Sequence, residues 1–180
     1  MSRQKSDALA QAWKTKENHL RRISLTEQRR FQATPDNIFP LLCPTTELDW
    51  LPGWDCELMH TKSGYSEFNC IFKTGFMGFD ELFICTRYEK NHAIDYLRIS
   101  EHACGKLEIK LIDHCDGTTT TIWLIILSAL DENGNDMLKH ISETSDLFDN
   151  VLDSLEYYLK YGDMINETTK AGNDKVHSEL

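Results

Sequence analysis

The chain has no apolar stretch long enough to span a membrane. A membrane-spanning helix needs about 20 consecutive apolar residues, whereas the longest apolar run here, Ile122–Leu127 (IWLIIL), has the length of a buried strand. The N-terminal sequence (MSRQKSDALAQAWKTKENHL) also lacks the apolar core of a secretory signal peptide. We therefore expect no integral membrane segment and a cytoplasmic protein.

Basic charge is scarce as well. The 19 Lys and Arg residues are outnumbered by 29 Asp and Glu residues, which gives a net charge of −10 at pH 7. Binding to a phosphate backbone usually depends on a basic patch. The one tight basic cluster, which comprises two Arg-Arg pairs at 21–22 and 29–30, is typical of a solvated strand face. We expect no nucleic-acid partner.

Closely spaced metal ligands are also missing. The six cysteines include no Cys-x-x-Cys pair, and the seven histidines include no His-x-x-x-His set. Zinc sites usually contain such a pair, because one turn of chain preorganises two ligands. The nearest approaches are His102 with Cys104, and His114 with Cys115, whose side chains would point to opposite faces of a strand. We therefore expect free, mostly buried thiols, no metal site and no cofactor.

The first part of the chain predicts a helix, a strand and short helices in turn. Residues 6–18 have helical periodicity. In the next stretch, RRISLTEQRRF (21–31), apolar and polar residues alternate, which predicts a long first strand. Pro35 suits a first helical position, and Pro40 keeps the helix that follows short or kinked.

From Trp54 to Leu130 one strand follows another. Three segments have one clean apolar face each. These faces are Trp54, Cys56 and Leu58, then Phe68, Cys70 and Phe72, then Leu107, Ile109 and Leu111. Two segments, 79–89 and 91–100, are mixed on both faces. Short turns between strands favour an antiparallel meander over a parallel sheet.

The end of the chain predicts a turn, a long helix and a polar tail. DENGND (131–136) is typical of a turn. A mostly apolar series then recurs at spacings of three and four, which predicts one amphipathic helix of about 25 residues that ends near Gly162. The series is Leu138, Ile141, Ser145, Phe148, Leu152, Leu155 and Leu159. Residues 166–180 are polar, and we expect them to be disordered. The fold class is therefore α+β.

Three segments resemble the START-like superfamily, also called SRPBCC, which includes birch-pollen-allergen-like and polyketide-cyclase-like proteins. They are FQATPDNIFPLL (31–42), WLPGW (50–54) and LFDNVLDSLEYYLKYG (147–162). The resemblance covers residues 20–165 and leaves residues 1–19 as an N-terminal helical extension. It implies a helix-grip fold, in which a curved seven-stranded antiparallel sheet wraps round a long C-terminal helix, with two short helices after strand one. The superfamily shares no catalytic residue set, so no catalytic residue is predicted.

The resemblance also implies a cavity between the sheet and the C-terminal helix, where relatives bind lipids, sterols, plant hormones or polyketides. We therefore expect this protein to bind a hydrophobic or amphipathic small molecule. One alternative is a cyclase-like or hydrolase-like enzyme acting on such a ligand, and another is a co-chaperone-like protein–protein adaptor. A binder predicts a closed apolar cavity, and an enzyme predicts a buried charged residue beside an open mouth. An adaptor predicts a filled core with an exposed apolar patch.

The candidate cavity residues come from the clean strand faces, one mixed strand, the segment before strand two and the long helix. They are Trp50, Trp54, Leu58, Phe68, Cys70, Phe72, Tyr96, Arg98, Leu107, Ile109, Leu111, Ile141, Phe148 and Leu152. For any one of them, core packing is the simpler interpretation. As a set, they line the volume that one helix against a strongly curved sheet leaves unfilled.

Chemistry in such a cavity requires polar groups within an apolar wall. The candidates are Tyr96, Arg98, Glu81 and His60. The parity of strand 91–100 leaves two alternatives open for Arg98. Either it faces inward with Tyr96 and needs a carboxylate partner or an anionic ligand, or the intervening apolar residues face inward and Arg98 is solvated.

The segment TTTTIWLIILSAL (118–130) predicts a strand that is apolar on both of its faces, although one face of a single curved sheet is the outer one. A large exposed apolar patch is unusual on a monomer. We expect the N-terminal helix, through Leu9 and Trp13, to cover this face, with a homodimer as the alternative.

The stretch CPTTELDWLPGW (43–54) predicts a corner that leads into strand two. Pro52-Gly53 is a turn signal, and Trp54 opens the strand on its apolar face. Trp50 either caps the end of the cavity or packs on the short helices. Glu47 and Asp49 are expected in a solvent-facing loop, where their pKa values would be little perturbed.

Overall fold

The structure is a computed structural model that describes residues 19–143 and 147–165. The predicted N-terminal helix and the predicted disordered tail lie outside these residues. None of the helices in the described part of the chain is long and apolar enough to cross a membrane.

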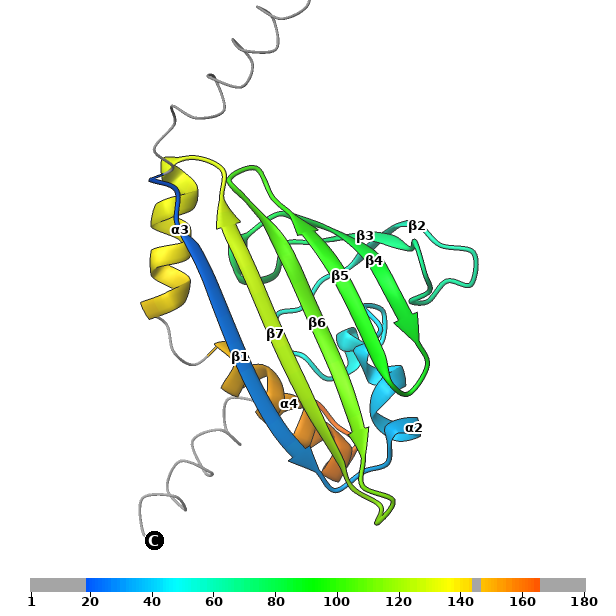
Figure 1. Ribbon diagram of the computed structural model, residues 1–180. Helices are drawn as coiled ribbons and strands as arrows, with labels where there is room; N and C mark the ends of the chain where they lie inside the picture. The colour runs from blue at the N-terminus through cyan, green and yellow to red at the C-terminus, as the bar shows by residue number, and fades with distance from the viewer. Residues whose placement is uncertain (1–18, 144–146, 166–180) are drawn as a thin grey trace, which may run out of the picture.

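In the residues that the structure describes, seven strands, four short helical turns and two longer helices make up the fold (Figure 1). In chain order they are β1 (Arg22–Phe31), α2 (Pro35–Ile38), η1 (Phe39–Leu42), η2 (Glu47–Asp49), β2 (Glu57–His60), β3 (Ile71–Thr74), η3 (Phe76–Gly78), β4 (Glu81–Glu89), β5 (Ala93–Ile99), β6 (Ala103–Asp113), β7 (Thr119–Ala129), α3 (Glu132–Glu143) and α4 (Leu147–Tyr161). The strands form one antiparallel sheet in the order β1-β7-β6-β5-β4-β3-β2. The predicted α+β class and the seven-stranded antiparallel sheet are confirmed.

The pairing of the strands determines which side chains share the inner face of the sheet. Among the described strands, β1 is the one that pairs out of sequence order: it lies antiparallel to β7, from Arg22 opposite Ser128 to Phe31 opposite Thr119. Side chains alternate between the two faces of a strand, and β6 and β7 pair without a register shift. The inner face therefore collects Trp123 and Ile125 from β7 and Ile109 from β6, all of them buried.

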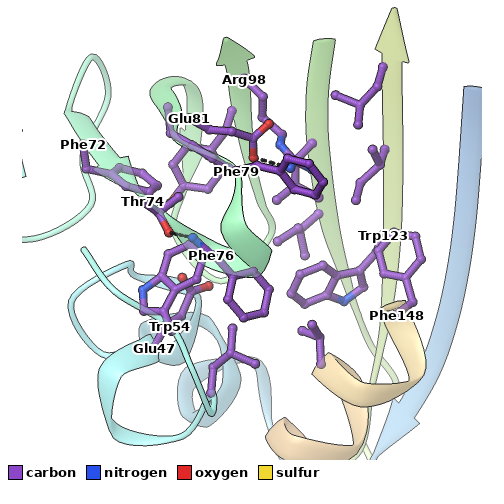
Figure 2. Close-up of a pocket in the computed structure, with 18 of the residues that line it drawn as sticks. Glu47, Trp54, Phe72, Thr74, Phe76, Phe79, Glu81, Arg98, Trp123 and Phe148 are labelled. Carbon is purple, nitrogen blue, oxygen red and sulfur yellow. Dashed lines mark hydrogen bonds and ion pairs between the residues drawn. The ribbon is translucent and has the colours of Figure 1, made fainter. Parts of the chain in front are cut away.

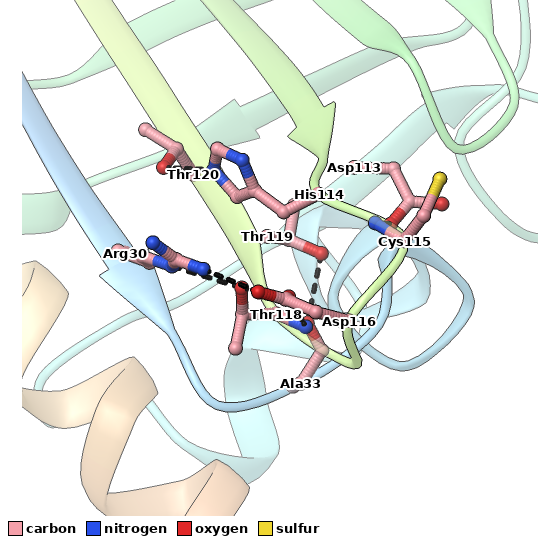
Figure 3. A network of polar contacts seen from close by, with 9 residues as sticks. All are labelled: Arg30, Ala33, Asp113, His114, Cys115, Asp116, Thr118, Thr119 and Thr120. Atoms are coloured by element: carbon pink, nitrogen blue, oxygen red, sulfur yellow. Dashed lines mark hydrogen bonds and ion pairs between the residues drawn. The ribbon is translucent and has the colours of Figure 1, made fainter.

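A polar network fixes the lower end of β1 against the β6–β7 hairpin (Figure 3). The Arg30 guanidinium donates to Asp116 Oδ2 at 2.6 Å and to Thr118 Oγ1 at 2.9 Å. The buried Thr119 hydroxyl donates to the Ala33 carbonyl at 2.8 Å, just before α2 begins. These contacts hold the start of the short helices close to the sheet, where they help to build the pocket described below.

The C-terminal helical region differs from the prediction. After β7, the described residues form two helices, α3 and α4, whereas the sequence predicts one continuous helix of about 25 residues. In Figure 1, α4 lies across one face of the sheet, whereas α3 runs beside β1 and β7. The helices that pack against the sheet are therefore the 15-residue α4 and the end of α3.

The segment DENGND is also not a turn, because α3 begins at Glu132. Asp131 accepts a hydrogen bond from the Gly134 backbone N–H at 2.9 Å and so caps the first turn of the helix. Gly134 is needed for close packing, because a Cβ atom there would lie 2.1 Å from the His102 carbonyl oxygen.

The outer face of β7 presents Ile122, Leu124 and Ile126, all of them partly buried. The register places polar neighbours on both sides of this row, such as Thr26 of β1 and Glu108 of β6 beside Leu124. The aliphatic parts of such side chains cover some of the apolar surface. Whether the N-terminal helix covers the rest stays a prediction.

Candidate ligand-binding site

The corner from Cys43 to Trp54 forms one end of the site, and two tryptophans anchor it. The Trp50 indole N–H donates to the Leu41 carbonyl at 2.9 Å, and the Trp54 indole N–H donates to the Pro44 carbonyl at 2.8 Å. Gly53 takes a φ of +76°, a left-handed conformation that glycine adopts without strain. Trp50 is fully buried against the short helices, so packing there, and not capping of the cavity, is its role in the structure.

An apolar pocket opens between this corner, the inner face of the sheet and α4 (Figure 2). Its free volume is about 100 Å³. Its apolar lining is Leu51, Trp54, Phe72, Phe76, Phe79, Phe83, Leu107, Ile109, Trp123, Ile125, Leu127, Ile141, Phe148 and Val151. Many of these rings pack against one another at an angle, for example Trp54 on Phe76 with centroids 5.3 Å apart. Such edge-to-face packing gives a wall suited to aromatic and aliphatic ligands.

One buried ion pair interrupts the apolar wall. Arg98 faces the pocket with Tyr96, and its Nη2 donates to Glu81 Oε2 at 2.5 Å. The side chains of Glu81 and Arg98 are only 5% and 15% exposed, so each charge depends on the other for its stabilisation. Arg98 also lies over the Phe83 ring, with its Cζ 5.1 Å from the ring centroid. Of the two alternatives, the structure shows the inward Arg98 with a carboxylate partner.

Two further polar groups of the pocket are satisfied within the protein. The Tyr96 hydroxyl lies 2.9 Å from the Ser66 hydroxyl and donates to the Leu42 carbonyl. The Thr74 hydroxyl donates to Asp55 Oδ1 at 2.9 Å and accepts from the Phe76 backbone N–H. Neither group needs a ligand to complete its hydrogen bonding.

The expectation that Glu47 lies in a solvent-facing loop is wrong. Its side chain is partly buried and lines the pocket, on the same side as Trp54 in Figure 2. Burial, more than the neighbouring Cys43, raises the pKa of the Glu47 carboxyl well above its ordinary value. Asp49, two residues on, is exposed as predicted. The 3-10 turn η2 aims one acid inward and the other outward, which strand-like alternation could not predict.

The predicted cavity residues separate into three groups. Those that line the pocket are Trp54, Phe72, Tyr96, Arg98, Leu107, Ile109, Ile141 and Phe148. Those that are packed in the core outside its lining are Trp50, Leu58, Cys70, Leu111 and Leu152. Phe68 belongs to neither group, because it is 61% exposed and precedes β3. The prediction that Phe68 faces inward is wrong, since Asn69 takes a φ of +66° and breaks the alternation before the strand begins.

Several lining residues were not predicted. Trp123, Ile125 and Leu127 form one face of β7, but that strand is apolar on both faces and periodicity alone could not select one. Phe76 and Phe79 lie in and just after η3, where no strand periodicity applies. His60, a polar candidate, is exposed and does not line this pocket.

The structure contains no candidate metal site among the residues it describes. No group of three or more His, Cys, Asp or Glu side chains there is arranged to hold a metal ion. All six cysteines are free thiols. Cys56, beside the corner, has a pKa raised to about 12, chiefly by burial, so it is protonated at neutral pH.

Comparison with solved structures identifies the fold. Truncated norcoclaurine synthase from Thalictrum flavum matches with a TM-score of 0.60 at 11% identity, over 78% of this chain and 94% of that chain. A START superfamily protein from Mycobacterium smegmatis matches with a TM-score of 0.55 at 13% identity, over 76% and 97% of the two chains. Ara h 8.0201 matches with a TM-score of 0.52 at 14% identity, over 77% and 98%.

These matches show that the chain has the START-like, or SRPBCC, helix-grip fold, as the sequence resemblance predicts. Within that class, the short helices after β1 and the C-terminal helices packed on the sheet give the arrangement seen in the allergen-like structures. No protein-family model matches the sequence, and no curated protein sequence matches it. At these identities the likeness concerns the fold alone.

Proposed function

We propose that this protein binds a hydrophobic or amphipathic small molecule in the pocket between its sheet and α4. The observation that carries the proposal is a wall of aromatic and aliphatic side chains with free space and few polar groups. Such a pocket is the usual form of a small-molecule site. A protein–protein adaptor predicts a core that side chains fill, and the free volume of the pocket argues against that alternative.

The size of the pocket limits the ligand. The free volume is about 100 Å³, whereas a cavity of about 150 Å³ accepts benzene. A ligand with a single ring therefore requires small movements of the wall. Phe76 and Phe79 are only partly buried, so their side chains are the ones we expect to turn aside.

A nuclear magnetic resonance titration with benzyl alcohol tests this function. We expect chemical-shift changes at pocket residues such as Tyr96, Trp123 and Val151. Replacing Val151 with Trp would fill the pocket from α4 and abolish the changes. Lys160→Trp places the same side chain on an exposed position of α4 and should leave them intact. Equal shift changes in the V151W and wild-type proteins would contradict binding in this pocket.

An enzyme acting on such a ligand is the second candidate, because the pocket wall carries buried charged residues. Glu47 has the accessible carboxyl and raised pKa that suit a general acid or base. One of the matched structures is that of a synthase. If the protein is an enzyme, Glu47→Gln will abolish conversion of the bound molecule, measured by mass spectrometry, while binding persists.

A further inference from the structure

Glu47 stands apart from every other polar side chain in the pocket. Glu81 and Arg98 pair with each other, and the hydroxyls of Tyr96 and Thr74 have partners within the protein. In the described part of the chain, no hydrogen bond or ion pair engages the Glu47 carboxyl. Among the described residues, Glu47 is therefore the one pocket carboxyl group without a partner, and a ligand could supply that partner.

The Glu47 carboxyl is also within reach of a ligand. Its oxygen atoms are not among the enclosed, unpartnered polar atoms, so they keep accessible surface. Arg98 Nε is the opposite case, since it lacks a partner but is fully enclosed. In Figure 2, Glu47 lies in the lower part of the pocket with Trp54, and the Glu81–Arg98 pair lies in the upper part. A ligand that reaches Glu47 need not disturb that ion pair.

The charged side chains that line the pocket determine which ligand charge the pocket favours. Two carboxyl groups and one guanidinium line the pocket, so its formal charge is −1 with Glu47 ionised and zero with Glu47 protonated. In neither state is it positive, which disfavours an anionic ligand such as a carboxylate. A cation on an apolar body would neutralise Glu47. The aromatic rings of Trp54 and Phe76 also line the pocket, and a cation that reaches the face of such a ring is attracted to it.

We propose that Glu47 is the specificity-determining residue of the pocket and that it selects a ligand with an apolar body and a protonated amine. The inference rests on the proposed function, because it names the chemical class of the same ligand. It predicts that a cationic ligand binds more tightly than a neutral ligand of the same shape, and both more tightly than an anionic one.

Binding of an amine should be linked to the ionisation of Glu47. The pKa of the free carboxyl is raised by burial, and a bound cation favours its charged form. Amine affinity should therefore fall as the pH is lowered through that raised pKa, whereas affinity for a neutral alcohol should not. The titratable groups that interact with Glu47 are Cys43, Cys56 and Tyr96. The raised pKa values of Cys56 and Tyr96 keep both neutral in this range.

Isothermal titration calorimetry of the full chain with benzylamine, benzyl alcohol and benzoate tests the inference. For the wild type we expect benzylamine to bind about tenfold more tightly than benzyl alcohol, and benzoate to bind most weakly. Glu47→Gln should remove the preference for the amine and leave the alcohol unchanged. Asp49→Asn, which removes the exposed acid of the same turn, should leave the order unchanged.

The outcomes separate the two proposals. If none of the three probes binds, the proposed function fails, and the inference fails with it. If benzyl alcohol binds but benzylamine has no advantage, or the advantage survives in E47Q, only the inference is overturned. Should E47Q not fold, the pH dependence of the wild type decides, since benzylamine affinity that does not fall on acidification contradicts a role for this carboxyl.

Discussion

At the scale of single residues, Arg98 and Glu81 place two charges in an otherwise apolar wall. Taking either charge out of water is costly, and their mutual attraction offsets this only while both are present. The sequence predicts that an inward Arg98 needs a carboxylate partner or an anionic ligand. The apolar residues of its strand are divided almost evenly between the two faces, so the sequence does not predict which face Arg98 takes. Glu81 was a candidate on another mixed strand, and only the pairing of β4 with β5 brings the two together.

Replacing Arg98 alone should therefore lower the stability of the fold more than replacing both members of the ion pair. We expect Arg98→Met to lower the free energy of unfolding by about 3 kcal/mol, because Glu81 is left buried without its partner. The double variant E81Q/R98M should recover most of that loss. Urea unfolding measures both. A double variant as unstable as the single one would show that the charge of Glu81 is not the cause.

Gly105 is the residue of β6 that least tolerates a side chain. It pairs with Arg98 on one side and Leu127 on the other, and a Cβ atom there would lie 1.8 Å from the Ile126 carbonyl oxygen. We expect Gly105→Ala to destabilise the fold by about 2–3 kcal/mol, because the backbone of β7 would have to shift. Thermal unfolding measures this. The adjacent variant Cys104→Ala should change the stability little, and equal effects of the two substitutions would argue against this cause.

At the scale of elements, strands with one clean apolar face were predictable and irregular segments were not. The faces around Phe72 and Ile109 point inward as predicted, because period-two alternation determines which side chains share a face. The start of α3 was missed, because its glycine and its Asp131 cap are also typical of turns. The division into α3 and α4 was missed as well, since the helical spacing of three and four runs from Leu138 to Leu159 when the polar Ser145 is counted in it.

Helix α4 is tied to β1 by one arginine. Arg29 forms ion pairs with Asp149, Asp153 and Glu156 on successive turns of the helix. The acids are mostly exposed, so we expect Arg29→Gln to cost about 0.5–1 kcal/mol at low salt and almost nothing near 1 M salt. Urea unfolding at the two salt concentrations measures the effect. A loss that is independent of salt would mean that Arg29 acts through packing.

At the scale of the whole molecule, the sheet has one face turned to the pocket and one turned away. The inner face of β7 is the one that lines the pocket. The apolar row on its outer face (Ile122, Leu124 and Ile126) does not line the pocket. We predict that residues 1–18 cover this row. Deletion of these residues should lower the melting temperature or produce dimers, measured by calorimetry and light scattering. If neither property changes, the prediction that residues 1–18 cover the outer face of β7 is wrong.

The central claim is that the pocket holds a small apolar molecule. Native mass spectrometry of the full chain purified from its own host tests this most directly, because it weighs the protein together with whatever it has bound. We expect a co-purifying amphipathic molecule, most simply an amine, that is absent from the V151W variant and present in K160W. Repeated recovery of ligand-free wild-type protein, together with no binding of benzylamine or benzyl alcohol, would contradict the account.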